Sequence, residues 1–147
     1  MKKLTIPLIT IAVLAILALL LFTLKERRMT QIARNLDCGP NSLFVADAKQ
    51  LLMSVRVGWR ISDASAFTRS FPGGSITLAQ KQLKNMVQRA EMEVAGQHNL
   101  SEFVNPEASE VKNDKIEAEI ESAIESKLDK NSGIKIESLV ISSAKQH

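Results

Sequence analysis

The stretch "SVRVGWRISDASAF", residues 54–67, decides the fold class because it joins a strand pattern directly to a helix start. Apolar and polar side chains alternate over residues 51–61 with a period of two, which is typical of a strand with one buried face. Ser62 or Asp63 then offers a side-chain oxygen to the free amides of a helix over residues 64–71. We therefore expect a half-buried strand that is followed at once by a short helix.

Turn residues and apolar spacing mark the next elements. The Pro-Gly-Gly sequence at residues 72–74 ends the short helix, and Ser75 caps a long amphipathic helix that runs to Gly96. A short element over residues 101–104 follows. Asn105-Pro106 then forms a polar break.

A third helix is predicted over residues 109–130, with an isoleucine or leucine at every fourth residue from Ile116 onward. The Asn-Ser-Gly sequence at residues 131–133 ends this helix. Residues 134–142 are β-rich, but their apolar positions change face, which indicates a bulge or a strand covered on both faces. The order strand, helix, helix, helix, strand predicts an α+β domain in which the last strand pairs with the first.

The N-terminal segment is a candidate transmembrane helix. From Leu4 to Leu24 it contains no charged residue, and at ~1.5 Å per residue it extends roughly 31 Å, the thickness of a hydrocarbon core. We favour an uncleaved anchor over a cleaved secretory signal, because the apolar stretch is longer than a usual signal core and no small-residue cleavage motif follows. Lys25, Arg27 and Arg28 are the expected headgroup contacts. Because basic residues flank both ends, charge alone does not set the orientation.

The net charge of +3 belongs to the membrane flanks. Residues 1–28 contain five basic and one acidic side chain, a net charge of +4, whereas residues 29–147 contain 14 basic and 15 acidic side chains, a net charge of −1. The soluble part therefore lacks the basic surface that nucleic-acid binding requires. Aromatic residues make up only 4% of the chain, so stacking platforms for single strands are missing as well.

No constellation of residues in the sequence predicts catalysis or metal binding. Cys38 is the only cysteine, which excludes an intramolecular disulfide and a thiolate cluster from one chain. His98 lacks a second histidine at zincin spacing, and His147 is the terminal residue. Residues 73–75 lack the lysine of a phosphate loop and the pattern of a nucleophile elbow. We therefore expect a non-enzymatic protein without catalytic residues, metal or cofactor.

The third predicted helix has an acidic outer face that includes Glu117, Glu119 and Glu121. Such a face is usually a solvated surface. A second interpretation is head-to-tail self-association, because residues 29–100 carry a net charge of +3 (eight basic, five acidic) and residues 101–147 carry −4 (six basic, ten acidic). We keep the three glutamates as candidate interaction residues.

Three stretches in order resemble the SPFH or band 7 family, which includes stomatins, prohibitins, flotillins and the bacterial HflC and HflK modulators of a membrane-bound AAA protease. In "AKQLLMSVRVGWRISDASAFTRSF", the Trp59-Arg60-Ile61 step before Asp63 is similar to the aromatic-Arg-Ile strand end of the family. The other two stretches are "NLSEFVNPEASEV" and "EAEIESAIESKLDKNSGIKIESLVIS". The likeness covers about residues 43–142, and "WRISD" is most similar to the HflC type.

The resemblance implies a membrane-anchored, non-enzymatic scaffold or modulator, with Trp59 and Arg60 as further candidate interaction residues. The implied partners are membrane lipids, further copies of the chain or a related SPFH subunit, and a membrane AAA protease. The implied location is a bacterial inner membrane, with the N-terminus in the cytoplasm. The alternative is a small tethered binding module that works as a monomer, for example an accessory subunit of an envelope or transport complex.

The expected domain organisation has three parts. Residues 1–28 form the anchor with its basic flanks, residues 29–42 form a linker or irregular entry, and residues 43–147 form the SPFH/band 7-like domain. Family members usually carry further strands before the aromatic-Arg-Ile strand and a coiled coil after the closing strand. We therefore expect a shortened member of the family.

Overall fold

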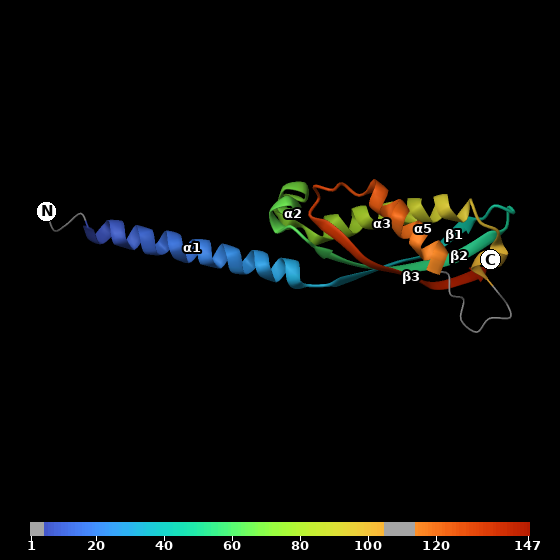
Figure 1. The fold of residues 1–147 in the computed structure, drawn as a ribbon, viewed down its shortest axis with the longest axis horizontal. Coiled ribbons are helices and arrows are strands. Elements are labelled where there is room, and N and C mark those ends of the chain that lie inside the picture. Colours follow the sequence, from blue (N-terminus) through green and yellow to red (C-terminus); the bar gives the residue numbers. More distant parts are fainter. Residues whose placement is uncertain (1–4, 105–113) are drawn as a thin grey trace.

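The computed structural model describes residues 5–104 and 114–147, with side chains from residue 9 onward. A long N-terminal helix, α1 (Thr5–Gln31), projects from one end of an α+β domain, and the C-terminus lies at the opposite end of that domain (Figure 1). The predicted fold class is confirmed. Leu4, the expected first residue of the anchor, lies outside the described residues.

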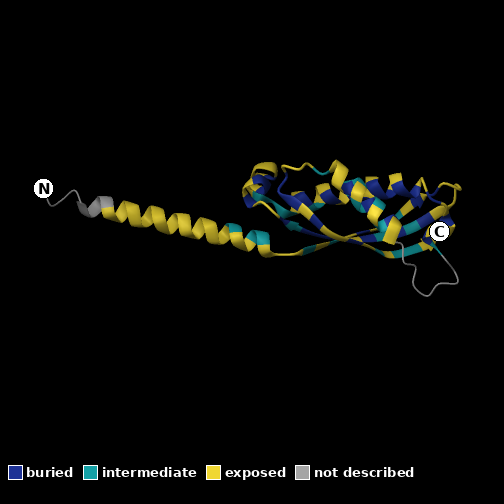
Figure 2. Cartoon of the chain, viewed as in Figure 1, coloured by how far each residue is buried: buried dark blue, intermediate teal, exposed yellow. Residues whose placement is uncertain are grey.

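The described part of α1 is a mostly apolar helix that the rest of the chain leaves uncovered. Its side chains are almost all exposed, whereas the buried residues of the domain gather between the sheet and the helices (Figure 2). Residues 9–31 are long and apolar enough to cross a membrane. An exposed apolar helix of this length is unfavourable in water, so α1 requires an apolar surrounding.

The domain contains a three-stranded antiparallel sheet in the order β1-β2-β3, formed by β1 (Arg34–Phe44), β2 (Gln50–Ile61) and β3 (Ile134–Gln146). The alternating stretch that predicted a strand is β2, and it is the central strand. Its partner β3 is the predicted closing strand, with Trp59 opposite Ile136. The expected pairing of these two segments is confirmed.

The irregular segment expected over residues 29–42 is corrected by the structure. Helix α1 continues to Gln31, and β1 begins at Arg34 and pairs with β2 along its length. The Gly39-Pro40 peptide falls at a register shift between Cys38 and Asn41. Because β1 is an edge strand, the missing amide of a proline costs no ladder hydrogen bond on its outer side. Gly39 has a φ of 114°, a value that favours glycine.

The helices cover one face of the sheet (Figure 1). Their bounds are α2 (Ala64–Ser70), a 3-10 turn η1 (Pro72–Gly74), α3 (Ile76–Ala95), α4 (Leu100–Phe103) and α5 (Asp114–Lys127). Asp63 caps α2 by accepting from the Ala66 amide, and Ser75 caps α3 by accepting from the Leu78 amide, as predicted. The predicted break at residues 105–106, and residues 109–113 of the predicted third helix, lie outside the described residues.

The core lies between the helices and the inward-facing residues of β2. Trp59, Phe67 and Phe103 are the largest of its fully buried side chains. The predicted bulge in the closing strand is confirmed, since the β2–β3 register shifts twice and leaves Glu137 and Ser142 as extra residues. These shifts return the apolar residues of β3 to the covered face of the sheet.

Candidate functional site: the anchor junction and the acidic helix

The anchor junction is the place where α1 meets the domain. The last turns of α1 contact α2 and β2, and Met29 packs against the edge of the hydrophobic core. The Thr30 hydroxyl donates to the Arg27 carbonyl at 3.0 Å, which satisfies the hydroxyl group within the final turn of α1. The anchor therefore passes into the domain without a linker, and the domain is held at the end of the apolar segment.

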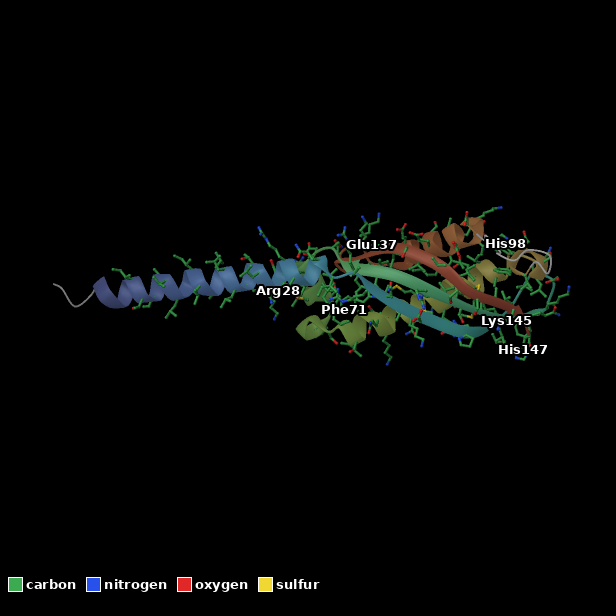
Figure 3. All side chains as sticks on the ribbon, turned by 90° about the horizontal axis from the view of Figure 1, so that it is seen from below. Arg28, Phe71, His98, Glu137, Lys145 and His147 are labelled. Atoms are coloured by element: carbon green, nitrogen blue, oxygen red, sulfur yellow. The ribbon has the colours of Figure 1, made fainter. Side chains whose placement is uncertain are left out.

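Basic side chains surround this junction. Lys25, Arg27 and Arg28 are all exposed, and Arg28 lies where α1 reaches the domain (Figure 3). An open depression of about 430 Å³ separates α1 from the start of α2 and is lined by Arg27, Glu26 and Asp63, among others. If α1 crosses a bilayer, the junction lies at the depth of the lipid headgroups. The positive charges of Lys25, Arg27 and Arg28 are favourable at that depth.

Trp59 and Arg60 point to opposite faces of β2 and make different contacts. Trp59 has no exposed surface, and the Arg34 guanidinium lies 5.5 Å from its ring centroid. This burial agrees with the place of Trp59 on the apolar face of the predicted strand, and its role as a candidate interaction residue stays a prediction. Arg60 lies on the uncovered face of the sheet, with its Nε 2.8 Å from a carboxylate oxygen of Glu137. The first bulge of β3 supplies that glutamate.

The three candidate glutamates of α5 also differ from one another. Glu117 accepts a hydrogen bond from the Ile141 amide at 2.8 Å, and so occupies a donor on the outer edge of β3. Glu119 Oε2 lies 2.5 Å from His98 Nε2. Glu121 is half-buried and has no hydrogen bond or ion pair to any residue the structure describes. Among the three, Glu121 alone makes no hydrogen bond or ion pair within the part of the chain that the structure describes.

Sequence reasoning missed the role of His98. Its ring is buried at the end of α3, with Glu102 of α4 3.1 Å from Nδ1 and Glu119 of α5 at Nε2. The hydrogen bond to Glu119, and then that to Glu102, raise the pKa of His98. The i,i+4 spacing of His98 and Glu102 was a readable signal, whereas the contact with Glu119 depends on the tertiary fold.

Sequence reasoning also missed Glu91, a fully buried carboxyl on α3. Its position, four residues after the core residue Val87, places it on the apolar face of the helix and could have revealed its burial. The described ranges 5–104 and 114–147 contain no group of three His, Cys, Asp or Glu side chains that could hold a metal ion.

The whole-chain comparison decides the family. The model of the SPFH domain / Band 7 family matches residues 6–145, which include all but one residue of α1 and of β3 and every other described helix and strand. The chain belongs to the SPFH/Band 7 family. No curated protein matches it in a sequence comparison.

Membership gives the general character of this SPFH/Band 7 chain. The family consists of membrane-associated scaffold proteins that are generally non-enzymatic. Their domains generally self-oligomerise. The apolar α1 and its direct contact with the SPFH domain agree with a membrane-associated member.

Proposed function

We propose that this protein is a single-pass, non-enzymatic membrane scaffold whose SPFH domain lies at the bilayer surface and packs against further copies or related subunits. The observation that carries the proposal is the anchor junction. An exposed apolar helix ends in Lys25, Arg27 and Arg28, and its last turns contact α2 and β2. Such a junction fixes both the depth and the tilt of the domain relative to the membrane.

The finer assignment is an HflC-like modulator of a membrane AAA protease in a bacterial inner membrane. Its support is the likeness of "WRISD", residues 59–63, to that type. The orientation that accompanies it places the N-terminus in the cytoplasm and the SPFH domain on the other side. A reporter fused after His147 tests this orientation, since activity of a cytoplasm-specific reporter there would reject it.

The anchor is tested on native membranes washed with alkaline carbonate. The full chain should remain in the membrane fraction, and mass spectrometry should find residues 4–24 on the retained protein. Leu17→Arg places a charge in the middle of α1, at a cost of about 3 kcal/mol, and should weaken retention, whereas Leu17→Met should not. Retention of a chain that lacks residues 4–24 would reject the single-pass anchor.

Self-association is proposed to use the charge difference between α5 and α3. On α5, Glu121 makes no hydrogen bond or ion pair with the described residues, and Glu125 is exposed. On α3, the exposed basic residues are Lys81, Lys84 and Arg89. Opposite charge on two neighbouring helices suits packing of the α5 of one copy beside the α3 of the next.

Charge reversal tests this packing in the full-length protein extracted with its lipids. Glu121→Lys with Glu125→Lys should lower the native mass, because like charges then face each other. Glu117 and Glu119 are left unchanged, since their contacts lie within the chain. The control is Asp37→Lys with Glu137→Lys, which makes the same charge change on the uncovered face of the sheet. An equal mass for wild type and the α5 variant would reject the α5–α3 contact.

A further inference from the structure

Two buried titratable side chains lie near the C-terminal end of α3, at the end of the domain remote from α1. His98 lies at the same end of the domain as Lys145 and His147, whereas Arg28 lies at the junction with α1 (Figure 3). Glu91 lies two turns earlier, on the core face of α3. Neither side chain takes part in the anchor junction or in the proposed contacts between copies.

Glu91 is a carboxyl with too few partners to be buried as an anion. Its Oε2 accepts from Asn41 Nδ2 at 2.6 Å, and its Oε1 has no hydrogen-bond partner among the described residues. An ionised carboxylate in such a place bears a desolvation penalty, which a proton removes. Burial raises the pKa of Glu91 to about 7, against the opposing effect of the Asn41 bond.

The surroundings of Glu91 offer little to offset a negative charge. From β1 it faces Asn41 and the buried Cys38, and burial, followed by the charge of Glu91, raises the pKa of that thiol to about 11. Lys84, two turns earlier on α3, is the nearby cation, and its side chain is exposed. An exposed cation offsets a buried charge only weakly, so the surroundings favour neutral Glu91, which holds α3 against β1 best when it is protonated.

The surroundings of His98 favour the opposite charge state, because they suit a charged ring whereas those of Glu91 suit a neutral carboxyl. Each of its ring nitrogens faces a carboxylate oxygen, that of Glu102 at Nδ1 and that of Glu119 at Nε2. An imidazolium has two N–H donors and satisfies both carboxylates, whereas a neutral ring has one donor and leaves one carboxylate facing a lone pair. The geometry therefore fits the charged ring, which connects the turn after α3 to both α4 and α5.

The other charged groups around His98 are largely paired with one another. On α5, Lys115 Nζ lies 3.9 Å from Glu119. Glu93 of α3 pairs with Lys127 of α5 along the groove of about 650 Å³ that separates these helices. In the β1–β2 turn, Asp47 pairs with Lys49 and accepts from the Leu100 amide. None of these groups could take over the role of protonated His98 in its contacts with the carboxylates of Glu102 and Glu119.

We propose that this remote end of the domain is a proton-dependent latch. Neutral Glu91 and protonated His98 hold β1, α3, α4 and α5 together, and loss of the two protons loosens α3 from β1 and releases α5. The latch is a property of one chain, because its contacts lie within that chain.

Glu91 and His98 both lose a proton as the pH rises, and both losses lower the stability of the folded domain. The pKa of His98 is raised, so its contribution is complete below about 6.5 and is lost as the pH rises through the folded value. The pKa of Glu91 is also raised, so the folded state binds its proton more tightly, and this advantage falls from about pH 4.5 and is gone above about pH 7. The stability contributions of Glu91 and His98 are therefore both lost around neutral pH.

Hydrogen exchange of the full-length protein in lipid nanodiscs tests the latch between pH 5.5 and 8.5, with rates corrected for intrinsic exchange. Peptides from α3, α4 and α5 should open about tenfold more at pH 8 than at pH 6, which corresponds to an average of about half a proton released per opening over these two pH units. Peptides from β2 should change much less. Equal pH dependence in β2 and α5 would overturn the proposal.

Four variants sharpen the test. Glu91→Gln should remove the pH dependence of α3 and retain that of α5, whereas Glu119→Gln should open α5 even at pH 6. Glu93→Gln, the control, breaks the exposed pair with Lys127 and should leave the pH dependence unchanged. His98→Gln replaces Glu119→Gln if that variant does not fold. Wild-type pH dependence in the Glu91→Gln and His98→Gln variants would overturn the proposal.

Discussion

The two ends of the domain are held together by different kinds of contact. At the anchor junction, the rings of Phe67 and Phe71 pack 4.8 Å apart, Met29 lies against the core, and the Gly133 carbonyl accepts from the Ser62 amide. At the remote end, the titratable side chains of Glu91 and His98 add polar contacts to the apolar packing of residues such as Val94 and Phe103. Apolar and backbone contacts do not respond to pH, so the end at the membrane is fixed and the remote end is adjustable.

The largest expected effect is that of breaking the anchor end. Phe67→Ala removes a fully buried ring of α2 and should lower the free energy of unfolding by about 3–5 kcal/mol. Because the Phe67 ring lies in the hydrophobic core against Phe71, the loss should be the same at pH 6 and pH 8. Denaturant unfolding followed by the fluorescence of the buried Trp59 measures it in detergent-solubilised full-length protein. A loss that depends strongly on pH would contradict the comparison.

A smaller effect is expected for Gly133→Ala, which acts on the same end through the backbone. Gly133 has a φ of 72°, and a Cβ there would collide with the Asp63 carbonyl and the Phe67 backbone. Strain and displacement of α2 should cost about 2 kcal/mol. The same unfolding measurement applies, with Gly73→Ala as the control, because a Cβ at Gly73 meets nothing although its φ is also positive. Equal losses in the two variants would show that the close approach of α2 does not matter.

The smallest effect concerns the remote end. Between pH 6 and pH 8, the wild-type protein should lose about 1 kcal/mol more stability than Glu91→Gln, since the raised pKa of Glu91 makes the folded state lose a proton in this range. Parallel stability curves for the two proteins would show that Glu91 does not titrate in the folded state.

Local patterns explain why much of the fold was predictable. The period-two alternation identified β2, Asp63 and Ser75 identified two helix starts, and the change of face after Ile136 indicated the bulge. Strand β1 was missed because Gly39-Pro40 reads locally as a turn. Only its position at the edge of the sheet makes a proline acceptable there.

The candidate site was less predictable, because its contacts are tertiary. Glu119 meets His98 across 21 positions of the sequence, and Glu117 reaches the edge of β3, so two residues of an apparently solvated face have partners within the chain. Glu91 was readable from its helical spacing alone. The sequence did not reveal that the Glu91 carboxyl lacks a full set of hydrogen bonds, because this depends on β1, which supplies only Asn41 as a donor.

The central claim is that an SPFH domain fixed at the membrane by α1 assembles into a scaffold. The most direct test is the native mass of the full-length protein, extracted gently with its lipids and without crosslinking. The account predicts a large oligomer of this chain, alone or with a related subunit. A monomer or dimer with bound lipid would contradict the scaffold and favour a small tethered binding module.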